Sequence, residues 1–163
     1  MRYSISKSVF FDALQKAGSL PVSTKDIQCV LFRHNKIYNT NYDSVIAIDL
    51  PDLTGDIPDH IIPWRNVLQY LKFLPDGEIS VEVLENKVII HGADGGKFVA
   101  STPSTESFNI PGPKEYDQSV SVEGWKLKDA LSTALAFTGE EGRYALSCIF
   151  FRADKNLSAY SSD

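Results

Sequence analysis

Apolar and polar positions follow a pattern that repeats three times along this chain. Each repeat opens with a short run of period two, continues with apolar residues that return every three or four positions, and then resumes period two. These periods predict a strand, a helix and further strands. Equivalent first-strand positions are Ile5, Ile62 and Val122, which lie 57 and 60 residues apart. The pattern predicts three tandem βαβββ repeats, the third of which lacks one strand.

The predicted elements have the same order in every repeat. In repeat 1 they are a strand at 2–5, a helix at 10–18 and strands at 27–34, 36–42 and 44–50. In repeat 2 they are a strand at 59–63, a helix at 64–73 and strands at 78–86, 87–94 and 97–102. In repeat 3 they are a strand at 118–124, a helix at 126–137 and strands at 144–154 and 156–163. Asn, Asp and Gly between successive strands favour tight hairpins, so we predict an α+β fold with antiparallel meanders.

Each predicted helix has one apolar and one polar face. The apolar positions are expected to face the core: Phe10, Ala13, Leu14 and Ala17; Trp64, Val67, Leu68 and Leu71; Leu127, Ala130, Leu131, Ala134 and Leu135. The cations of these helices lie on the other faces: Lys16, Arg65, Lys72, Lys126 and Lys128. The helices are therefore expected to cover the sheets with their basic sides exposed.

The chain as a whole is acidic, with 16 Lys and Arg against 21 Asp and Glu and a formal net charge of −5. The three helical segments are nevertheless each net positive, so the acidic excess lies elsewhere. This distribution argues against a tight, sequence-reading DNA binder, which needs a broad basic surface. It permits loose contacts to DNA, and it equally permits lysines that only solvate exposed helix faces.

Length and composition are those of a globular protein, with 163 residues of which 43% are hydrophobic. The sequence contains neither an apolar run of about 18 residues, as a membrane helix needs, nor a signal-peptide pattern, so we predict a cytoplasmic protein without a membrane partner. Cys29 and Cys148 each lie in an apolar run and are expected to be buried thiols.

The sequence does not support an enzyme. His34, His60 and His91 lack the spacing of metal ligands and are expected at the surface or in hairpins. The glycine-rich run 92–98 lies between two predicted strands and lacks the hydroxyl that follows the lysine of a phosphate loop, so it is expected to be a hairpin. No nucleophile elbow is present. We predict no catalytic residue, metal site or cofactor.

A Pro-rich crossing at 109–113 separates repeats 2 and 3. We therefore predict a complete first domain at 1–113, built from two βαβββ repeats, and an incomplete second domain at 114–163.

Several local motifs resemble the bacterial DNA polymerase III beta subunit, the replicative sliding clamp. In the segment 61–111, a strand enters a helix that ends in Leu74-Pro75-Asp76-Gly77, and three strands lead to Ser101-Thr102-Pro103. The family's acidic-Phe-Pro element is represented by Glu106-Ser107-Phe108-Asn109, which departs from it. The segments 140–146 and 157–163 resemble the family's acidic-x-Arg-x-x-Leu motif and the strand before its Thr-Asp-Gly-His-Arg stretch.

The resemblance implies a DNA clamp fold whose helices line the hole of a ring and whose sheets form the outer wall. In such clamps two subunits close head to tail, slide on double-stranded DNA and tether the polymerase. Arg65, Lys72 and Lys128 match basic inner-helix sites of the family, and Lys25 roughly matches a basic site in the loop after the first helix. Lys16 and Lys126 are assigned to the DNA-facing set by helix geometry alone.

The resemblance also implies partners that carry short peptide motifs, namely DNA polymerase and clamp-loader subunits. Arg143, Leu146 and Ser162 match positions in the rim and floor of the family's peptide pocket. The family's pocket needs further residues from a third domain, so we expect this chain to contain only part of it. Without the resemblance, Leu146 is a core strand residue and Arg143 a solvated turn residue.

Three functions stay open on the sequence. The first is a sliding clamp whose family chains hold six such repeats, with this chain as a truncated or proteolytic fragment or a short relative. The second is a clamp-fold interaction module or replisome regulator that does not encircle DNA. The third is a small α+β enzyme with an unrecognised pocket. An incomplete third repeat would leave an unpaired sheet edge, which favours pairing with another chain.

Overall fold

The computed structural model describes residues 1–20, 29–41, 44–51, 53, 57–108, 110, 120–139, 148–153 and 156–161. The chain divides into two compact units, Met1–Gly112 and Pro113–Asp163, which we call the N-terminal and C-terminal units.

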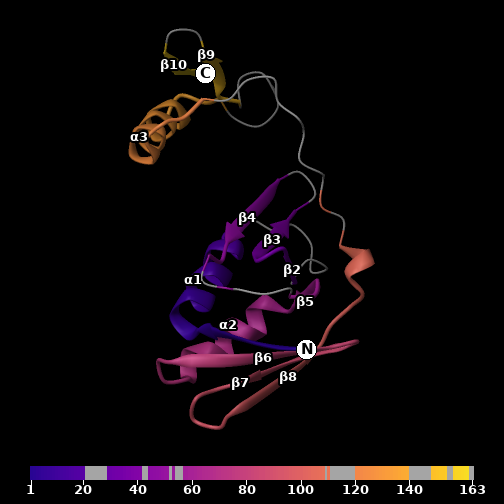
Figure 1. Ribbon diagram of the computed structural model, residues 1–163. Helices are drawn as coiled ribbons and strands as arrows, with labels where there is room; N and C mark the ends of the chain where they lie inside the picture. The colour runs from indigo at the N-terminus through magenta and orange to yellow at the C-terminus, as the bar shows by residue number, and fades with distance from the viewer. Residues whose placement is uncertain are drawn as a thin grey trace. The chain divides into compact units, whose positions relative to one another are not determined.

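The N-terminal unit contains repeats 1 and 2 in the predicted order (Figure 1). Repeat 1 forms β1 (Arg2–Ser6), α1 (Lys7–Ala17), β2 (Val30–Arg33), β3 (Lys36–Thr40) and β4 (Val45–Asp49). Repeat 2 forms β5 (His60–Ile62), α2 (Trp64–Phe73), β6 (Glu78–Leu84), β7 (Lys87–His91) and β8 (Lys97–Ser101), and the 3-10 turn η1 (Thr105–Ser107) follows. The prediction of an α+β fold with antiparallel sheets is confirmed.

The two repeats exchange their first strands. One sheet has the order β1-β6-β7-β8 and the other has the order β4-β3-β2-β5. Ile5 in β1 lies opposite Ile79 in β6, and its equivalent Ile62 in β5 lies opposite Val30 in β2. Each sheet therefore contains one strand from the other repeat, and neither repeat completes its sheet alone.

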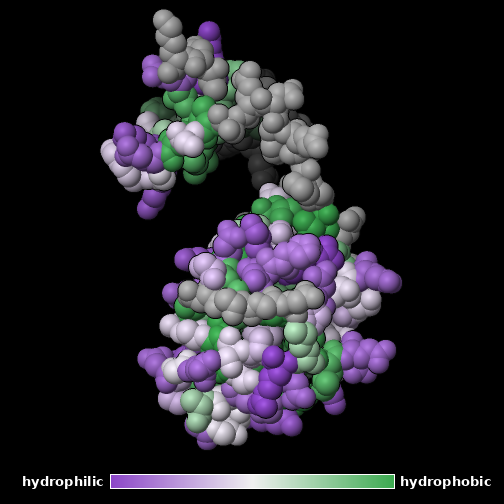
Figure 2. Space-filling view, viewed as in Figure 1, coloured by the Kyte–Doolittle hydropathy of each residue, from purple (hydrophilic) through white to green (hydrophobic). Residues whose placement is uncertain are grey.

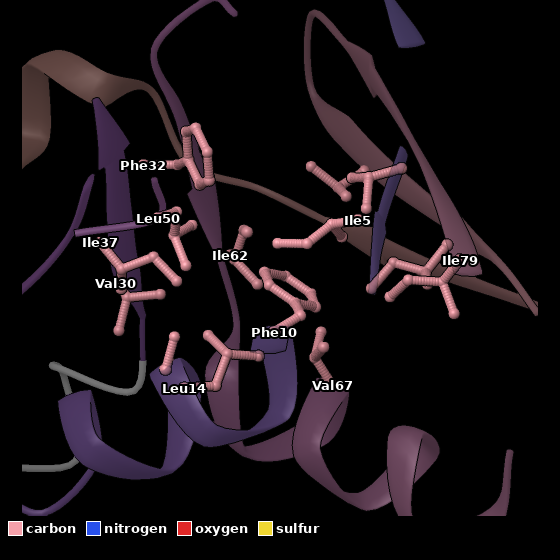
Figure 3. Packing of buried hydrophobic residues seen from close by; sticks show 14 of the residues in the cluster. Ile5, Phe10, Leu14, Val30, Phe32, Ile37, Leu50, Ile62, Val67 and Ile79 are labelled. Carbon is pink, nitrogen blue, oxygen red and sulfur yellow. The ribbon is translucent and has the colours of Figure 1, made fainter. Parts of the chain in front are cut away.

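The core lies between the two helices and the two sheets. Phe10 and Leu14 of α1 and Val67 of α2 point toward sheet residues that include Val30 and Ile79 (Figure 3). All five side chains are buried, and each contributes about 1.5–3 kcal/mol through the removal of apolar surface from water. The predicted core faces of α1 and α2 are confirmed, with Trp64 and Leu68 partly rather than fully buried.

The end of α1 lies against the start of α2. A Cβ at Gly18 would lie only 2.4 Å from the ring of Trp64, so the close approach requires glycine there. Figure 1 shows the two helices on the same side of the sheets. Their outward faces are therefore presented together.

Tight turns connect the meanders as predicted. His34 and Asn35, between β2 and β3, both have positive φ, at 50° and 56°, as a two-residue hairpin of type I′ requires. Gly95, between β7 and β8, has a φ of 83°. The glycine-rich run is therefore a hairpin, which confirms that it is not a phosphate loop.

The C-terminal unit contains α3 (Gly124–Leu135) and the antiparallel pair β9 (Phe150–Ala153) and β10 (Leu157–Tyr160). The prediction of a strand at 118–124 is wrong for 120–123, because these described residues pair with no strand. Eight of the thirteen exposed large hydrophobic residues in the described part of the chain belong to this unit: Val120, Val122, Trp125, Leu135, Phe137, Phe150, Phe151 and Tyr160.

Three burial predictions fail in this unit. Leu135 and Ala130 of α3 are exposed, although the helical period places them near the apolar face. Cys148 is also exposed, whereas Cys29 of repeat 1 is partly buried, and both thiols are free. The physical reason is the same in each case: the described part of this unit has one helix and two strands, which cover less apolar surface than two helices and two four-stranded sheets.

Candidate nucleic-acid interface

Three predicted DNA-facing cations of the N-terminal unit are exposed on its helices. Lys16 lies in the last turn of α1, and Arg65 and Lys72 lie at the two ends of α2. Arg65 and Lys72 are seven residues apart and so share one helix face, opposite the buried Val67 and Leu71. The Arg65 guanidinium lies 5.2 Å from the centre of the Trp64 ring, which holds the stem of this cation on the helix surface.

The three predicted cations of α1 and α2 differ in pairing from two cations on the meander of repeat 1. Within the described residues, Lys16, Arg65 and Lys72 have no carboxylate within ion-pair distance. On the meander of repeat 1, by contrast, Lys36 Nζ lies 2.8 Å from Asp49 Oδ1, and Arg33 pairs with Asp59. Lys16, Arg65 and Lys72 are therefore available to a phosphate, whereas those two meander cations are already neutralised by carboxylates.

Two further lysines without a carboxylate partner in the described part of the chain lie on the sheet β1-β6-β7-β8. Lys87 begins β7 and Lys97 begins β8. Side chains alternate along β7, and Val88 and Ile90 are in the core, so Lys87 points to the other face of the sheet. Lys97 pairs with His91, four pairs along the ladder from Lys87, and because four is an even number it shares that outer face. Lys87 and Lys97 therefore form a control pair with the same total charge as Arg65 and Lys72.

The two predicted cations of α3 differ from each other. Lys126 Nζ lies 3.0 Å from Glu123 Oε1 and 5.3 Å from the Trp125 ring. Lys128 is exposed and, within the described residues, has no ion-pair partner. On this geometry Lys128 is a better phosphate ligand than Lys126, because Lys126 has to leave its carboxylate partner first.

Four predicted site residues lie outside the described residues: Lys25, Arg143, Leu146 and Ser162. The predicted peptide pocket therefore stays a prediction. The described part of the C-terminal unit has a cavity of about 470 Å³ between residues 120–123, α3 and the two strands. Its lining includes Val120, Val122 and Phe151, which are among the exposed apolar side chains of this unit.

Sequence reasoning missed a buried polar pair in the N-terminal unit. Tyr3 of β1 and His60 of β5 are separated by 57 residues, which is the repeat length, and they meet where the two exchanged strands approach each other. His60 Nδ1 donates to the carbonyl of Pro58 at 2.8 Å, so Nε2 is the acceptor and the Tyr3 hydroxyl donates to it at 3.1 Å. The expectation that His60 lies at the surface is wrong.

Burial sets the protonation of this pair. Desolvation lowers the pKa of His60 to about 4 and raises the pKa of Tyr3. The ring of His60 also stacks on Phe32, with ring centres 4.7 Å apart. Both groups are neutral at pH 7, and their position in the core assigns them to the stability of the fold. The signal that could have found them is alternation: Ile5 and Ile62 point inward, so the residues two positions earlier do so as well.

The described residues contain no cluster of three or more His, Cys, Asp or Glu that could hold a metal ion. None of the described helices is long and apolar enough to span a membrane. The exposed cations of the helix layer are therefore the feature of the N-terminal unit on which we base a function.

Comparison with known proteins defines the class of fold. No protein-family model matches the sequence, and no curated protein matches it. The structure, however, is similar over 100% of this chain to the DNA polymerase III subunit beta from Pseudomonas aeruginosa, with a TM-score of 0.79 and 20% identity. It is also similar over its full length to the beta subunit of the DNA polymerase of Streptococcus pyogenes (TM-score 0.86, 14% identity) and to the Helicobacter pylori beta clamp (TM-score 0.80, 18% identity).

The fold is therefore a DNA clamp fold. More particularly, it is the fold of the bacterial DNA polymerase III beta sliding clamps, as the sequence motifs indicated. The chain spans about half the length of these proteins, covering 47% of each of the three.

Proposed function

We propose that this chain is part of a sliding clamp, a scaffold rather than an enzyme, that holds duplex DNA against its helix layer in the cytoplasm. Residues 1–113 are its first clamp domain, and 114–163 are the first half of a second. The observation that carries the proposal is the presence of unpaired, exposed cations on α1 and α2, on the side of the sheets that both helices cover.

This arrangement suits loose binding. Lys16, Arg65 and Lys72 can each approach a phosphate, but the described helices do not present the broad basic surface that tight binding needs. Contacts of this kind position a duplex without reading its sequence, because they reach only the backbone. Lys128 extends the same role to α3. Lys25, Lys126 and the partial peptide pocket of Arg143, Leu146 and Ser162 remain assignments from the resemblance or from helix geometry.

A ring also needs contacts between chains, and the N-terminal unit offers an edge for them. β8 lies at the end of its sheet, and a groove of about 660 Å³ runs between β8 and α2. Phe73 and Val99 line this groove and are 87% and 53% exposed. An open strand edge beside exposed apolar side chains supports the proposal that the ring is a homo-oligomer, tethered through peptide motifs to polymerase and loader subunits.

The proposal is tested by removing equal charge from two faces. The double variant Arg65→Ala/Lys72→Ala should weaken binding of a short duplex and reduce the slope of log K against log salt by up to about 2, because two phosphate contacts are lost. Lys87→Ala/Lys97→Ala makes the same change in net charge on the outer sheet face and should leave both quantities unchanged. Fluorescence anisotropy over a salt series measures them. An equal effect of both variants would contradict a DNA-binding helix layer.

A second arm of this test separates a clamp from a module that only binds a replisome. The protein is incubated with nicked circular plasmid, a bacterial clamp-loader complex and ATP, and is then passed over a sizing column. A clamp that encircles DNA should elute with the circle and be lost when a single cut linearises the plasmid. Retention that survives linearisation, or no retention at all, would favour the module.

A further inference from the structure

The helices α1 and α2 lie side by side and run in opposite directions. At one end, the ring of Trp64 at the start of α2 lies beside Gly18, which follows α1. At the other end, the backbone N–H of Lys7 at the start of α1 donates to the carbonyl of Gly77, in the turn after α2, at 2.9 Å. Figure 3 shows the two helices next to each other on one side of the core residues. The exposed sides of α1 and α2 therefore meet along one line.

The two cations of α2 lie on the half of its exposed face that is turned toward α1. Residues three or four positions apart share one side of a helix, so Arg65 and Lys72 both border the partly buried Leu68. The other half of the exposed face is turned toward β8, because Asn66 and Phe73 line the groove between α2 and β8. Arg65 and Lys72 do not line this groove. The cations are therefore directed toward α1 and away from the proposed ring contact.

α1 presents a neutral residue to the same line. Gln15 lies three residues before Gly18, so it shares the side of α1 that approaches Trp64, and its side chain is exposed. Asp12 and Lys16 are four residues apart and share the next side of α1, away from α2. The carboxylate of Asp12 is therefore not on the side of α1 that faces α2.

We call this exposed line between the helices the helix seam and define it by Gln15, Arg65 and Lys72. Figure 2 shows hydrophilic side chains on most parts of the visible surface of the N-terminal unit. α2 contains no acidic residue, and Asp76, in the turn after it, already pairs with Lys7. Seven residues of helix rise by about 10 Å, whereas successive phosphates of one DNA strand rise by about 3.4 Å, so the two seam cations can reach different phosphates.

One aromatic ring connects α1 to Arg65. The ring of Trp64 lies so close to Gly18 that an added Cβ would overlap with it, and the Arg65 guanidinium lies 5.2 Å from the ring centre. Within the described residues, Nε1 of Trp64 is buried without a hydrogen-bond partner, which costs stability that a phenylalanine would not cost. Tryptophan offers in return the most attractive ring face for a cation. Trp64 is therefore better suited to hold Arg65 than to stabilise the core.

We propose that one phosphodiester strand of duplex DNA lies along the helix seam, held by Arg65 and Lys72 and by the side-chain amide of Gln15, with Trp64 as the positioning residue of Arg65. The inference rests on the proposed DNA-binding helix layer and adds where on that layer the backbone lies. Gln15 donates an N–H to a phosphate oxygen, as neutral side chains commonly do at DNA backbones. Lys16, on the far side of α1, contributes less than either seam cation.

The first test adds one negative charge on either side of α2. Gln15→Glu places a carboxylate in the helix seam and should weaken binding of a short duplex by about tenfold, because it repels phosphate and pairs with the seam cations. Asn66→Asp makes the same change in net charge next to Arg65 but toward β8, and adjacent helix residues do not face each other. It should weaken binding by less than about threefold in about 0.1 M salt, by fluorescence anisotropy. Equal losses, or a larger loss from Asn66→Asp, would overturn the proposal.

The second test is a gain of binding, which misfolding cannot produce. Gln15→Lys adds a third cation to the helix seam and should tighten duplex binding and steepen the slope of log K against log salt by up to about 1. Asn66→Lys is the matched control and should change the slope by clearly less. Equal gains from the two substitutions would contradict a backbone that lies along the seam.

The third test separates a positioning role of Trp64 from a structural one. Trp64→Leu removes the ring under Arg65 and should weaken duplex binding by about two- to fivefold. In an Arg65→Ala background the same substitution should change binding no further, whereas Trp64→Phe alone should retain most of the affinity. A loss of the same size in both backgrounds would make Trp64 a structural residue and overturn its assigned role.

The double variant Arg65→Ala/Lys72→Ala separates failure of this inference from failure of the proposed function. If the double variant weakens duplex binding while the Gln15 and Asn66 substitutions act equally, the helix layer binds DNA at another place and only the seam is wrong. If neither the double variant nor any seam variant changes binding, the DNA-binding helix layer itself is contradicted.

Discussion

The helices α1 and α3 have the same apolar period but different surroundings. Leu14 and Leu131 are equivalent residues of the same type, yet Leu14 is fully buried and Leu131 is only partly buried. α1 packs beside α2 over two four-stranded sheets, whereas the described part of the C-terminal unit gives α3 one two-stranded sheet. An amphipathic period therefore specifies which side of a helix seeks burial, and the neighbouring repeat decides whether that side is covered.

The largest effect expected from this comparison is at the two leucines. Leu14→Ala should lower the free energy of unfolding of the N-terminal unit by about 2–5 kcal/mol, because it leaves a cavity in a filled core. Leu131→Ala should cost the C-terminal unit less than Leu14→Ala costs the N-terminal unit, because the side chain of Leu131 is only partly buried.

Urea unfolding can follow each unit separately, since the chain has two tryptophans and they lie in different units. Trp125→Phe leaves Trp64 as the reporter of the N-terminal unit, and Trp64→Phe leaves Trp125 as the reporter of the other. If Leu14→Ala and Leu131→Ala lowered the free energy of unfolding by comparable amounts, α3 would be covered as fully as α1. That result would contradict the difference between the two helices.

A second effect concerns pH and applies to the N-terminal unit, where the strand exchange buries His60. Its folded pKa of about 4 is below the ordinary value of 6.5, so between these values the unfolded chain binds the proton more readily. The contribution of His60 to the free energy of unfolding is fully present above about pH 7.5. It falls by about 3 kcal/mol as the pH drops to about 4, and below that pH this residue causes little further loss.

Asp and Glu carboxyl groups also titrate in this range, so the contribution of His60 is obtained as the difference between the wild type and a variant that lacks this imidazole. The double variant Tyr3→Phe/His60→Phe keeps two rings of similar size and removes the buried polar atoms together, which avoids an unpaired hydroxyl. Its urea midpoint should fall less than that of the wild type between pH 7.5 and 4.5. Parallel curves for the two proteins would show that His60 is not held neutral by burial.

Much of this fold could be predicted from periodicity, and particular residues show where that method ends. The period of α1 predicted four buried residues, and all four are buried. The exchange of β1 and β5 could not be predicted, because a strand's own pattern fixes which face is buried but not which sheet it joins. The burial of His60 was missed because histidine is usually exposed, and that expectation was given more weight than its position two residues before the buried Ile62.

The candidate site was predictable to a similar extent. The helical period placed Lys16, Arg65 and Lys72 on exposed faces, and the structure has them there. It could not show that Lys126 is paired with Glu123 whereas Lys128 is not, because that depends on side-chain distances. Leu135 was predicted to be inside by its period alone, and the structure has it exposed.

The smallest effect expected is at an ion pair that joins repeats 1 and 2. Lys7 Nζ, at the start of α1, lies 3.0 Å from Asp76 Oδ1 in the turn after α2, and the side chain of Asp76 is 91% exposed. Water screens such a pair, so Asp76→Asn should cost less than about 1 kcal/mol, and the cost should nearly vanish in about 1 M salt. The backbone bond from Lys7 N–H to the carbonyl of Gly77, at 2.9 Å, does not depend on this carboxylate.

Asp49→Asn provides the control, because Asp49 pairs with Lys36 inside repeat 1 at a similar distance of 2.8 Å. Equal, small and salt-sensitive losses from both variants in urea unfolding would indicate that apolar burial, rather than charge, holds the two repeats together. A loss above about 2 kcal/mol from Asp76→Asn alone would instead show that this ion pair holds repeats 1 and 2 together.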